Sequence, residues 1–174
     1  MKFFQSVIML VIALIMSVSI CNAQEKNNEM LLGVITSADL QKAPYESWYN
    51  KGNNEYQVDE ASLENLKTLM KGVDVKIMMG TWCHDSKREV PRFYKMLSVS
   101  GISEGQVEMI ALDKKKKAPN GEIDNIEITN TPTFIFYKNG QEMNRIVERP
   151  VESLEEDLVK ILKEKPYRHS KISR

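Results

Sequence analysis

One cysteine, placed between an apolar run and a helix-like stretch, constrains the fold of this chain more than any other feature. Cys83 lies in the segment 82–86, which reads Trp-Cys-His-Asp-Ser. The apolar residues of 73–79 predict a buried strand before it, and the pattern of 85–97 predicts a helix after it. Cys83 is therefore expected at a strand-to-helix turn, where the first helical N–H groups are unpaired and the helix dipole favours negative charge. A thiol in that place tends to ionise and becomes a better nucleophile.

The segment 82–86 resembles the active site of the thioredoxin superfamily, whose motif is Trp-Cys-x-x-Cys at the start of the helix that follows a central strand. Pro91 follows Cys83 by eight residues, which is the place of the proline that kinks the active-site helix in that family. The resemblance extends over residues 73–163. It implies an α/β fold of the thioredoxin-like, three-layer kind, with a central mixed sheet flanked by helices.

A second segment, Thr131-Pro132-Thr133, makes the resemblance more specific. It precedes the strand-like residues 134–137, and the resemblance implies a cis peptide bond before Pro132, which faces the nucleophile. Asn139-Gly140 then separates that strand from residues 143–147, and this dipeptide is the strongest short signal for a β-hairpin.

Two departures from the family pattern concern its chemistry. Ser86 stands where dithiol members have their second cysteine, so the site is a monothiol Cys-x-x-Ser variant that cannot form the intramolecular disulfide. Ile77 stands six residues before Cys83, where dithiol members carry a buried acid that assists the second cysteine. The second cysteine and the buried acid act together in dithiol members, so their joint absence is consistent. It suggests a site that is adapted to one-cysteine chemistry or one that is no longer catalytic.

The other strands and helices are predicted from apolar periodicity and capping residues. Residues 31–35 predict either a short strand or an ordered entry segment. Residues 107–112 predict a central strand, so that the connection from 73–79 is a parallel crossover. A weakly specified helix is expected to start at Pro44 and to stop near Gly52.

Two further helices have clearer signals. Asp59 suits the N-cap of one helix that ends at Gly72 and places four apolar residues on one face: Leu63, Leu66, Leu69 and Met70. Ser153 and Glu156 form a capping box for the last helix.

The ends of the chain divide it into four parts. Residues 1–23 are interpreted as a signal peptide, because a basic start is followed by an apolar core and a small-residue cleavage site before Gln24. Residues 24–57 are an N-terminal extension and 58–165 the thioredoxin-like domain. Residues 166–174 are a C-terminal tail that is expected to be poorly anchored.

Cleavage of the first part predicts an exported protein, periplasmic or secreted, in an oxidising compartment. Two other interpretations of 1–23 stay open, a retained membrane anchor and a lipoprotein signal with lipid on Cys21, and only these would attach the chain to a membrane. The apolar core is short for a span, and Ile20 fits poorly before a lipidated cysteine. With Cys21 removed, Cys83 is the only thiol, and no internal disulfide is possible.

The charge balance argues against a nucleic-acid partner, since the chain has 24 basic and 24 acidic residues. Its one charge run, Lys114–Lys117, is interpreted as a solvated loop because it has no amphipathic frame.

The candidate site has two catalytic residues, Cys83 and Ser86, and five substrate-binding residues: Trp82, His84, Asp85, Thr131 and Pro132. Some have structural alternatives. Asp85 in the first turn would stabilise any helix, and Ser86 either donates to the Cys83 thiolate or caps exposed amides. Trp82 suits surface contact, whereas Trp48 is interpreted as core. No metal and no cofactor are expected, because consecutive helical residues point about 100° apart and no standard ligand spacing is present.

These features predict an exported thioredoxin-like protein that acts in thiol–disulfide exchange through a single nucleophilic cysteine. Its partners would be protein thiols and disulfides, together with an external thiol or reductase that releases the mixed disulfide. The alternative is a non-catalytic peptide-binding module on the same fold. A monothiol glutaredoxin is less favoured because the chain lacks a Gly-Gly pair and a Thr-Val-Pro loop, and a peroxiredoxin because Gly80 stands where that family has Thr or Ser.

Overall fold

The computed structural model describes residues 30–171. The predicted signal peptide and Cys21 lie outside the described residues. Within them, no helix combines the length and the apolar character needed to cross a membrane.

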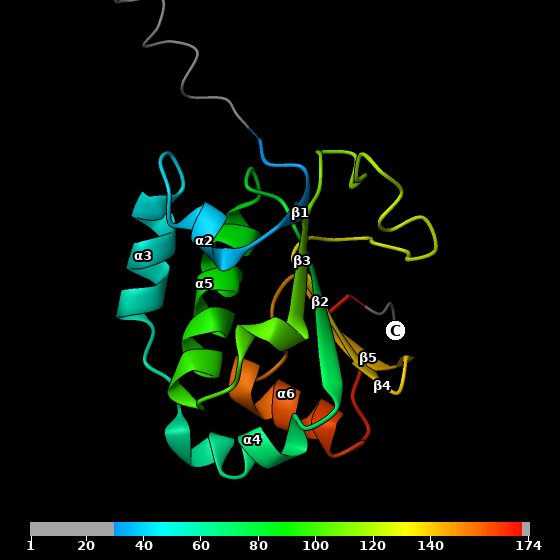
Figure 1. The fold of residues 1–174 in the computed structure, drawn as a ribbon. Coiled ribbons are helices and arrows are strands. Elements are labelled where there is room, and N and C mark those ends of the chain that lie inside the picture. The colour runs from blue at the N-terminus through cyan, green and yellow to red at the C-terminus, as the bar shows by residue number, and fades with distance from the viewer. Residues whose placement is uncertain (1–29, 172–174) are drawn as a thin grey trace, which may run out of the picture.

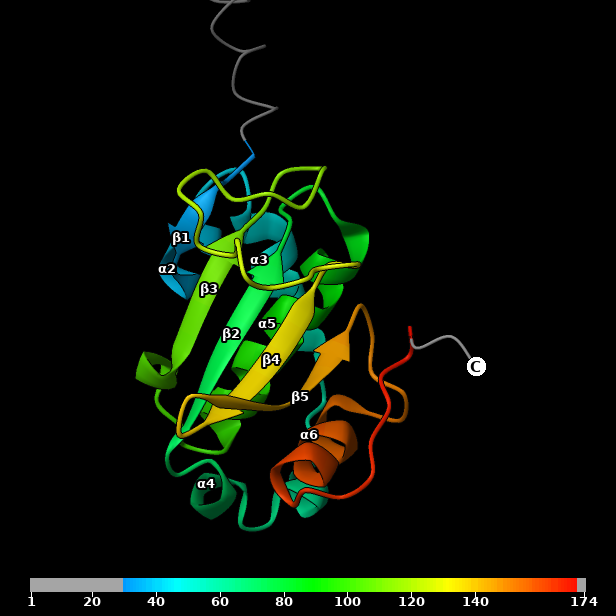
Figure 2. The same cartoon turned by 90° about the vertical axis from the view of Figure 1, so that its right-hand side faces the viewer.

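A mixed sheet forms the centre of the molecule (Figure 2). Its strand order is β1-β3-β2-β4-β5, with β2 and β3 parallel and the other neighbours antiparallel. This arrangement confirms the predicted α/β class and its parallel crossover. The bounds are β1 Gly33–Ile35, β2 Val73–Met79, β3 Val107–Ala111, β4 Thr133–Lys138 and β5 Gln141–Val147.

The helices lie on one face of this sheet (Figure 1). The long helix α5, His84–Val99, follows β2 directly and contributes Phe93 to the core, where its ring lies 4.9 Å from that of Phe134 in β4. The other helices are α2 Ser37–Leu40, α3 Glu46–Glu55, α4 Leu66–Leu69 and α6 Leu154–Leu162, with 3₁₀ turns at Glu60–Leu63 and Glu104–Gln106.

On the opposite face, the loop between β3 and β4, residues 112–132, lies over one end of the sheet (Figure 2). Ile123 of this loop packs against Met78, Ile110 and Ile135, which alternate along their strands with the side chains of the helical face. The loop also contains Lys114–Lys117, so the predicted loop location of this charge run is confirmed. The sheet therefore lies between the helices on one face and this loop at one end of the other face.

The hairpin between β4 and β5 turns at Asn139 and Gly140, as predicted. Both residues have positive φ, 52° and 75°, which a two-residue hairpin turn of the primed type requires. Glycine has no Cβ and adopts this conformation without strain, and asparagine tolerates it better than most residues.

The prediction of a single helix from Asp59 to Gly72 is wrong. Asp59 does cap a helical turn, because its carboxylate accepts the Ser62 N–H, but that turn is a 3₁₀ helix that ends at Leu63. Asn65 then adopts a left-handed conformation with φ 68°, which breaks the helical path before α4 begins. The apolar face survives the break, and Leu63, Leu66 and Met70 are all buried.

Residues 30–57, which belong to the predicted N-terminal extension, add β1, α2 and α3 to the structure. Strand β1 pairs with β3 at the sheet edge, and α3 packs along α5 (Figure 1). The expected helix in this region is present as α3, but it continues past Gly52 to Glu55. A Cβ at Gly52 would lie 2.7 Å from Pro91 Cγ, so glycine allows the two helices to approach closely.

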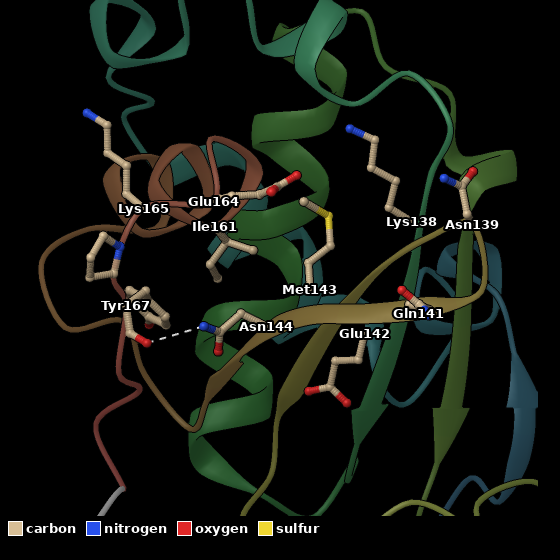
Figure 3. A pocket seen from close by; sticks show the side chains of 11 residues that line it. Lys138, Asn139, Gln141, Glu142, Met143, Asn144, Ile161, Glu164, Lys165 and Tyr167 are labelled. Atoms are coloured by element: carbon tan, nitrogen blue, oxygen red, sulfur yellow. Dashed lines mark hydrogen bonds between the residues drawn. The ribbon is translucent and has the colours of Figure 1, made fainter.

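Within the predicted C-terminal tail, residues 167–171 are anchored, contrary to the prediction. The Tyr167 hydroxyl donates to the buried Asp157 carboxylate at 2.8 Å. Asn144 Nδ2 donates to the Tyr167 carbonyl at 3.2 Å, as Figure 3 shows. Further along, Ser170 Oγ donates to the Val147 carbonyl, and Lys171 pairs with Glu148. Sequence periodicity missed these contacts because each joins single polar residues that are distant in the chain.

Candidate functional site

Cys83 is the N-cap of α5, at the turn that follows β2, as the sequence predicts. Its N–H donates to the Gly80 carbonyl at 2.9 Å, and its own carbonyl accepts the Lys87 N–H at 3.1 Å. As the N-cap, Cys83 lies at the positive end of a 16-residue helix. It is half-buried, so it remains partly accessible. Negative charge on sulfur is stabilised in such a position.

The loop before β4 lies against this cysteine. The peptide bond between Thr131 and Pro132 is cis, which confirms the expectation from the family resemblance. The Cys83 thiol donates to the Thr131 carbonyl at 3.1 Å. The structure thus brings together three of the predicted site residues, although they are separated by 48 positions in the chain.

Ser86 lies one turn further along α5 and is fully buried. Its hydroxyl oxygen accepts the Gly80 N–H at 3.2 Å, which ties the first turn of α5 to the end of β2. Ser86 was expected either to donate to the Cys83 thiolate or to cap a backbone amide, and this contact corresponds to the second alternative. A buried amide without an acceptor would be costly.

Trp82 connects the same turn to the residue that follows β3. Its indole N–H donates to the Leu112 carbonyl at 2.8 Å, and the ring lies over Gly80, where a Cβ would come within 2.6 Å of it. The half-buried ring therefore forms a fixed wall beside Cys83.

Asp85 and His84 point to other neighbours. The Asp85 carboxylate pairs with Arg88 at 2.6 Å, and Arg88 also pairs with the buried Glu89 at 2.5 Å. Burial opposes the charge of Arg88, but the hydrogen bonds and charges of Glu89 and Asp85 outweigh it and raise the guanidinium pKa. His84 is exposed and turns toward α3.

A pocket of about 490 Å³ opens between α3 and α5, directly beside His84. From α5 it is lined by His84, Lys87, Arg88 and Arg92, and from α3 and the residue after it by Trp48, Lys51, Gly52, Glu55 and Tyr56. We call it the α3–α5 pocket. Trp48 was predicted to be core, but it is half-buried, with one side on the core and the other on this pocket.

The α3–α5 pocket is the part of the site that sequence reasoning missed. Its α5 wall does have a signal, because His84, Lys87, Arg88 and Arg92 recur at the spacing of one helix face. Its α3 wall has none, since nothing in residues 48–56 indicates which helix they contact.

A larger hollow of about 700 Å³ lies elsewhere, between the β4–β5 hairpin, the end of α6 and the tail (Figure 3). The hairpin turn lies beside Val73 at the start of β2, whereas Cys83 follows the end of that strand. The larger hollow is therefore at the opposite end of the sheet from the thiol. It is not part of this site, although it is larger than the α3–α5 pocket.

Comparison with known proteins agrees with the fold. The family described as Thioredoxin matches residues 33–163. A protein of unknown function from Pseudomonas aeruginosa has a similar structure, with a TM-score of 0.55 and 14% identity over 76% of this chain and 91% of that chain. An HIV epitope scaffold gives a TM-score of 0.54 at 14% identity, over 76% and 92% of the two chains.

Sequence identity is higher for a thioredoxin of Fasciola hepatica, at 25%, but the match covers 51% of this chain and 80% of that chain with a TM-score of 0.33. No curated protein matches the chain.

Proposed function

The chain belongs to the thioredoxin family, and from that premise we propose that it acts in thiol–disulfide exchange with Cys83 as its single nucleophile. The observation that carries the proposal is the position of this thiol. It is half-exposed at the N-terminus of α5 and lies 3.1 Å from the carbonyl that precedes Pro132. The sulfur therefore lies beside a backbone segment that can hold an extended peptide, which supports a role in exchange.

The proposed reaction begins when the Cys83 thiolate attacks one sulfur of a substrate disulfide. The substrate S–S bond breaks, a bond from Cys83 Sγ to that sulfur forms, and the other substrate sulfur leaves with the electron pair and takes up a proton. The positive end of α5 stabilises the attacking charge. Loss of the thiol proton before attack removes the donor to Thr131, so the carbonyl becomes free to accept a backbone N–H of the substrate.

Release of the product needs a second thiol from outside the site. Ser86 occupies the position from which dithiol family members resolve the adduct, and its hydroxyl cannot do so. Either another thiol of the substrate or an external thiol must then attack the mixed disulfide. The first route isomerises the substrate disulfide, and the second reduces it.

The proposal is tested with a disulfide-bonded peptide and intact-mass measurement under non-reducing conditions. We expect one peptide adduct on Cys83 that accumulates and disappears when a small thiol is added. Cys83→Ser is the matched control and should form no adduct. Failure of the wild-type chain to form an adduct while its thiol remains reduced would contradict the proposal.

We further propose that the protein works outside the cytoplasm after removal of residues 1–23. The support is the order of basic start, apolar core and small residues before Gln24. N-terminal sequencing of the protein recovered from expressing cells should begin at Gln24. Recovery of the intact N-terminus, or of a lipid on Cys21, would contradict this proposal.

A peptide-binding module without turnover is the second candidate. Ser86 favours it, because this buried hydroxyl serves the backbone of Gly80 and leaves Cys83 without a resolving partner. A binder should keep its affinity for a partner peptide in the Cys83→Ala variant. An exchange protein should lose covalent capture in that variant.

A further inference from the structure

The α3–α5 pocket begins at the residue next to the nucleophile. His84 lines it, and the Lys87 N–H donates to the Cys83 carbonyl, so the pocket and the thiol share the first turn of α5. A molecule joined to Cys83 through sulfur could therefore extend into this space. At about 490 Å³, its volume is in the range of pockets that hold small ligands.

The charge of the pocket favours an anion. Four cations line it, Lys51, Lys87, Arg88 and Arg92, against a single lining carboxylate, Glu55. The two arginines are already paired with carboxylates outside the lining, Asp85 and Glu89.

The two lysines differ from the arginines in this respect. In residues 30–171, neither Lys51 nor Lys87 forms an ion pair. The Lys87 ammonium lies 6.0 Å from the centre of the Trp48 ring. Both lysines are thus available to pair with an incoming carboxylate.

The walls of the pocket provide apolar contact beside this charge. Trp48 is half-buried and exposes part of its indole. The Arg92 guanidinium lies over the Tyr56 ring, 5.2 Å from the ring centre. Two aromatic rings and two unpaired ammonium groups suit a ligand that has an apolar or planar body and a carboxylate.

We propose that the α3–α5 pocket binds the carboxylate of a small thiol, or of its disulfide, that exchanges with Cys83. The inference rests on the proposed function and assigns it a co-substrate: a low-molecular-weight, carboxylate-bearing thiol. With Ser86 unable to resolve an adduct, such a thiol would attack the mixed disulfide on Cys83. A new S–S bond to Cys83 forms, and the substrate sulfur leaves as a thiol with the proton. A second molecule of the small thiol then frees Cys83 and departs as the oxidised disulfide.

The test uses two aromatic disulfides that differ in charge. 5,5′-Dithiobis(2-nitrobenzoate) carries two carboxylates, and 4,4′-dithiodipyridine is neutral. Rates of reaction with both are measured on the full chain carrying Cys21→Ser, so that Cys83 is the only thiol, at low salt. The double variant Lys51→Gln/Lys87→Gln removes the two unpaired cations. The matched control, Lys67→Gln/Lys71→Gln, removes two exposed cations near the start of β2, at the other end of the sheet.

We expect the pocket variant to lower the rate with the anionic disulfide by about fivefold, since two partly screened charge contacts of this kind give effects of that order. The rate with the neutral disulfide should not change, and the control variant should change neither. High salt should remove the difference. An unchanged ratio of the two rates in the pocket variant overturns the inference, as does an equal loss in the control. A wild-type thiol that reacts with neither reagent overturns the proposed function itself.

Discussion

At the scale of single residues, the site depends on contacts that hold the turn between β2 and α5 in one conformation. Ser86 accepts the Gly80 N–H, Trp82 donates to Leu112, and Cys83 donates to Thr131. The thiol of Cys83 is the only one of these three groups whose chemistry the proposed function uses. The hydroxyl and the indole determine where that thiol lies.

Replacing Ser86 by alanine should destabilise the protein, because the buried Gly80 N–H then has no acceptor. We expect a loss of about 1–3 kcal/mol in the free energy of unfolding. Denaturant unfolding measures it, with Ser98→Ala on the exposed side of α5 as the control, where the change should be small. Equal stability of the Ser86→Ala variant and the wild type would show that the contact contributes little.

Replacing Ser86 by cysteine tests the loss of the resolving thiol. The new sulfur lies one turn from Cys83, where dithiol family members resolve their adducts, so the peptide adduct should no longer accumulate and reduced peptide should appear without an external thiol. Mass measurement over time separates the two outcomes. If the adduct persists as in the wild type, the missing thiol at position 86 is not the only difference from dithiol family members.

At the scale of elements, α3 and α5 form the walls beside the thiol and depend on a close approach at Gly52. Asn53 Nδ2 donates to the Pro91 carbonyl at 3.2 Å and adds a polar contact between the same helices. A change in the separation of α3 and α5 would therefore alter the α3–α5 pocket.

Gly52→Ala should separate these helices. Alanine favours a helix over glycine by about 1 kcal/mol, but its Cβ would meet the rigid ring of Pro91, and overpacking of this kind costs about 1–3 kcal/mol. We expect a net loss of stability in thermal unfolding. Asn54→Ala on the exposed side of α3 provides the comparison and should be neutral or stabilising. A Gly52→Ala variant more stable than the wild type would contradict the close contact.

The elements differ in how well the sequence predicts them. Strand β2, the hairpin at Asn139-Gly140 and the start of α5 follow from local pattern, because apolar alternation, turn residues and the family motif all lie within a few residues. The break at Asn65 does not, since the apolar face on both sides of it keeps a helical spacing. Within the site, the family resemblance implied that Pro132 faces Cys83, and the hydrogen bond from Cys83 to Thr131 beside it was not predicted. To predict the α3–α5 pocket, one must know that α3 and α5 are neighbours. An amphipathic pattern indicates which face of a helix is buried but not which element that face contacts.

At the scale of the whole molecule, several tyrosines tie distant segments to the core. Tyr56 donates to the buried Glu155 at 2.8 Å and Tyr167 to the buried Asp157 at 2.8 Å. Burial, followed by these carboxylates, raises the pKa of both phenols well above the ordinary value. Burial likewise raises the pKa of Tyr49 and Tyr94, with Glu104 adding to the effect.

Stability should therefore fall at alkaline pH. A phenol whose pKa is raised by folding stabilises the folded state below the unfolded value of 10.0, and this contribution is lost as pH rises from there toward the folded value. Each such phenol should contribute a slope of up to about 1.4 kcal/mol per pH unit. Denaturant unfolding between pH 9 and 11.5, with tyrosinate absorbance, measures the effect. Tyr167→Phe should flatten the slope, and an unchanged slope would contradict a raised pKa at this residue.

The central claim, that the fold activates Cys83 for exchange, is tested most directly by the rate at which the thiol reacts with 4,4′-dithiodipyridine. The measurement compares the native chain carrying Cys21→Ser with the same chain unfolded in guanidinium, at equal pH. We predict a native rate faster by about tenfold, because a helix N-terminus can stabilise charge by roughly 1–2 kcal/mol in a partly buried site. A native rate equal to or slower than the unfolded rate would contradict the claim and favour a peptide-binding module.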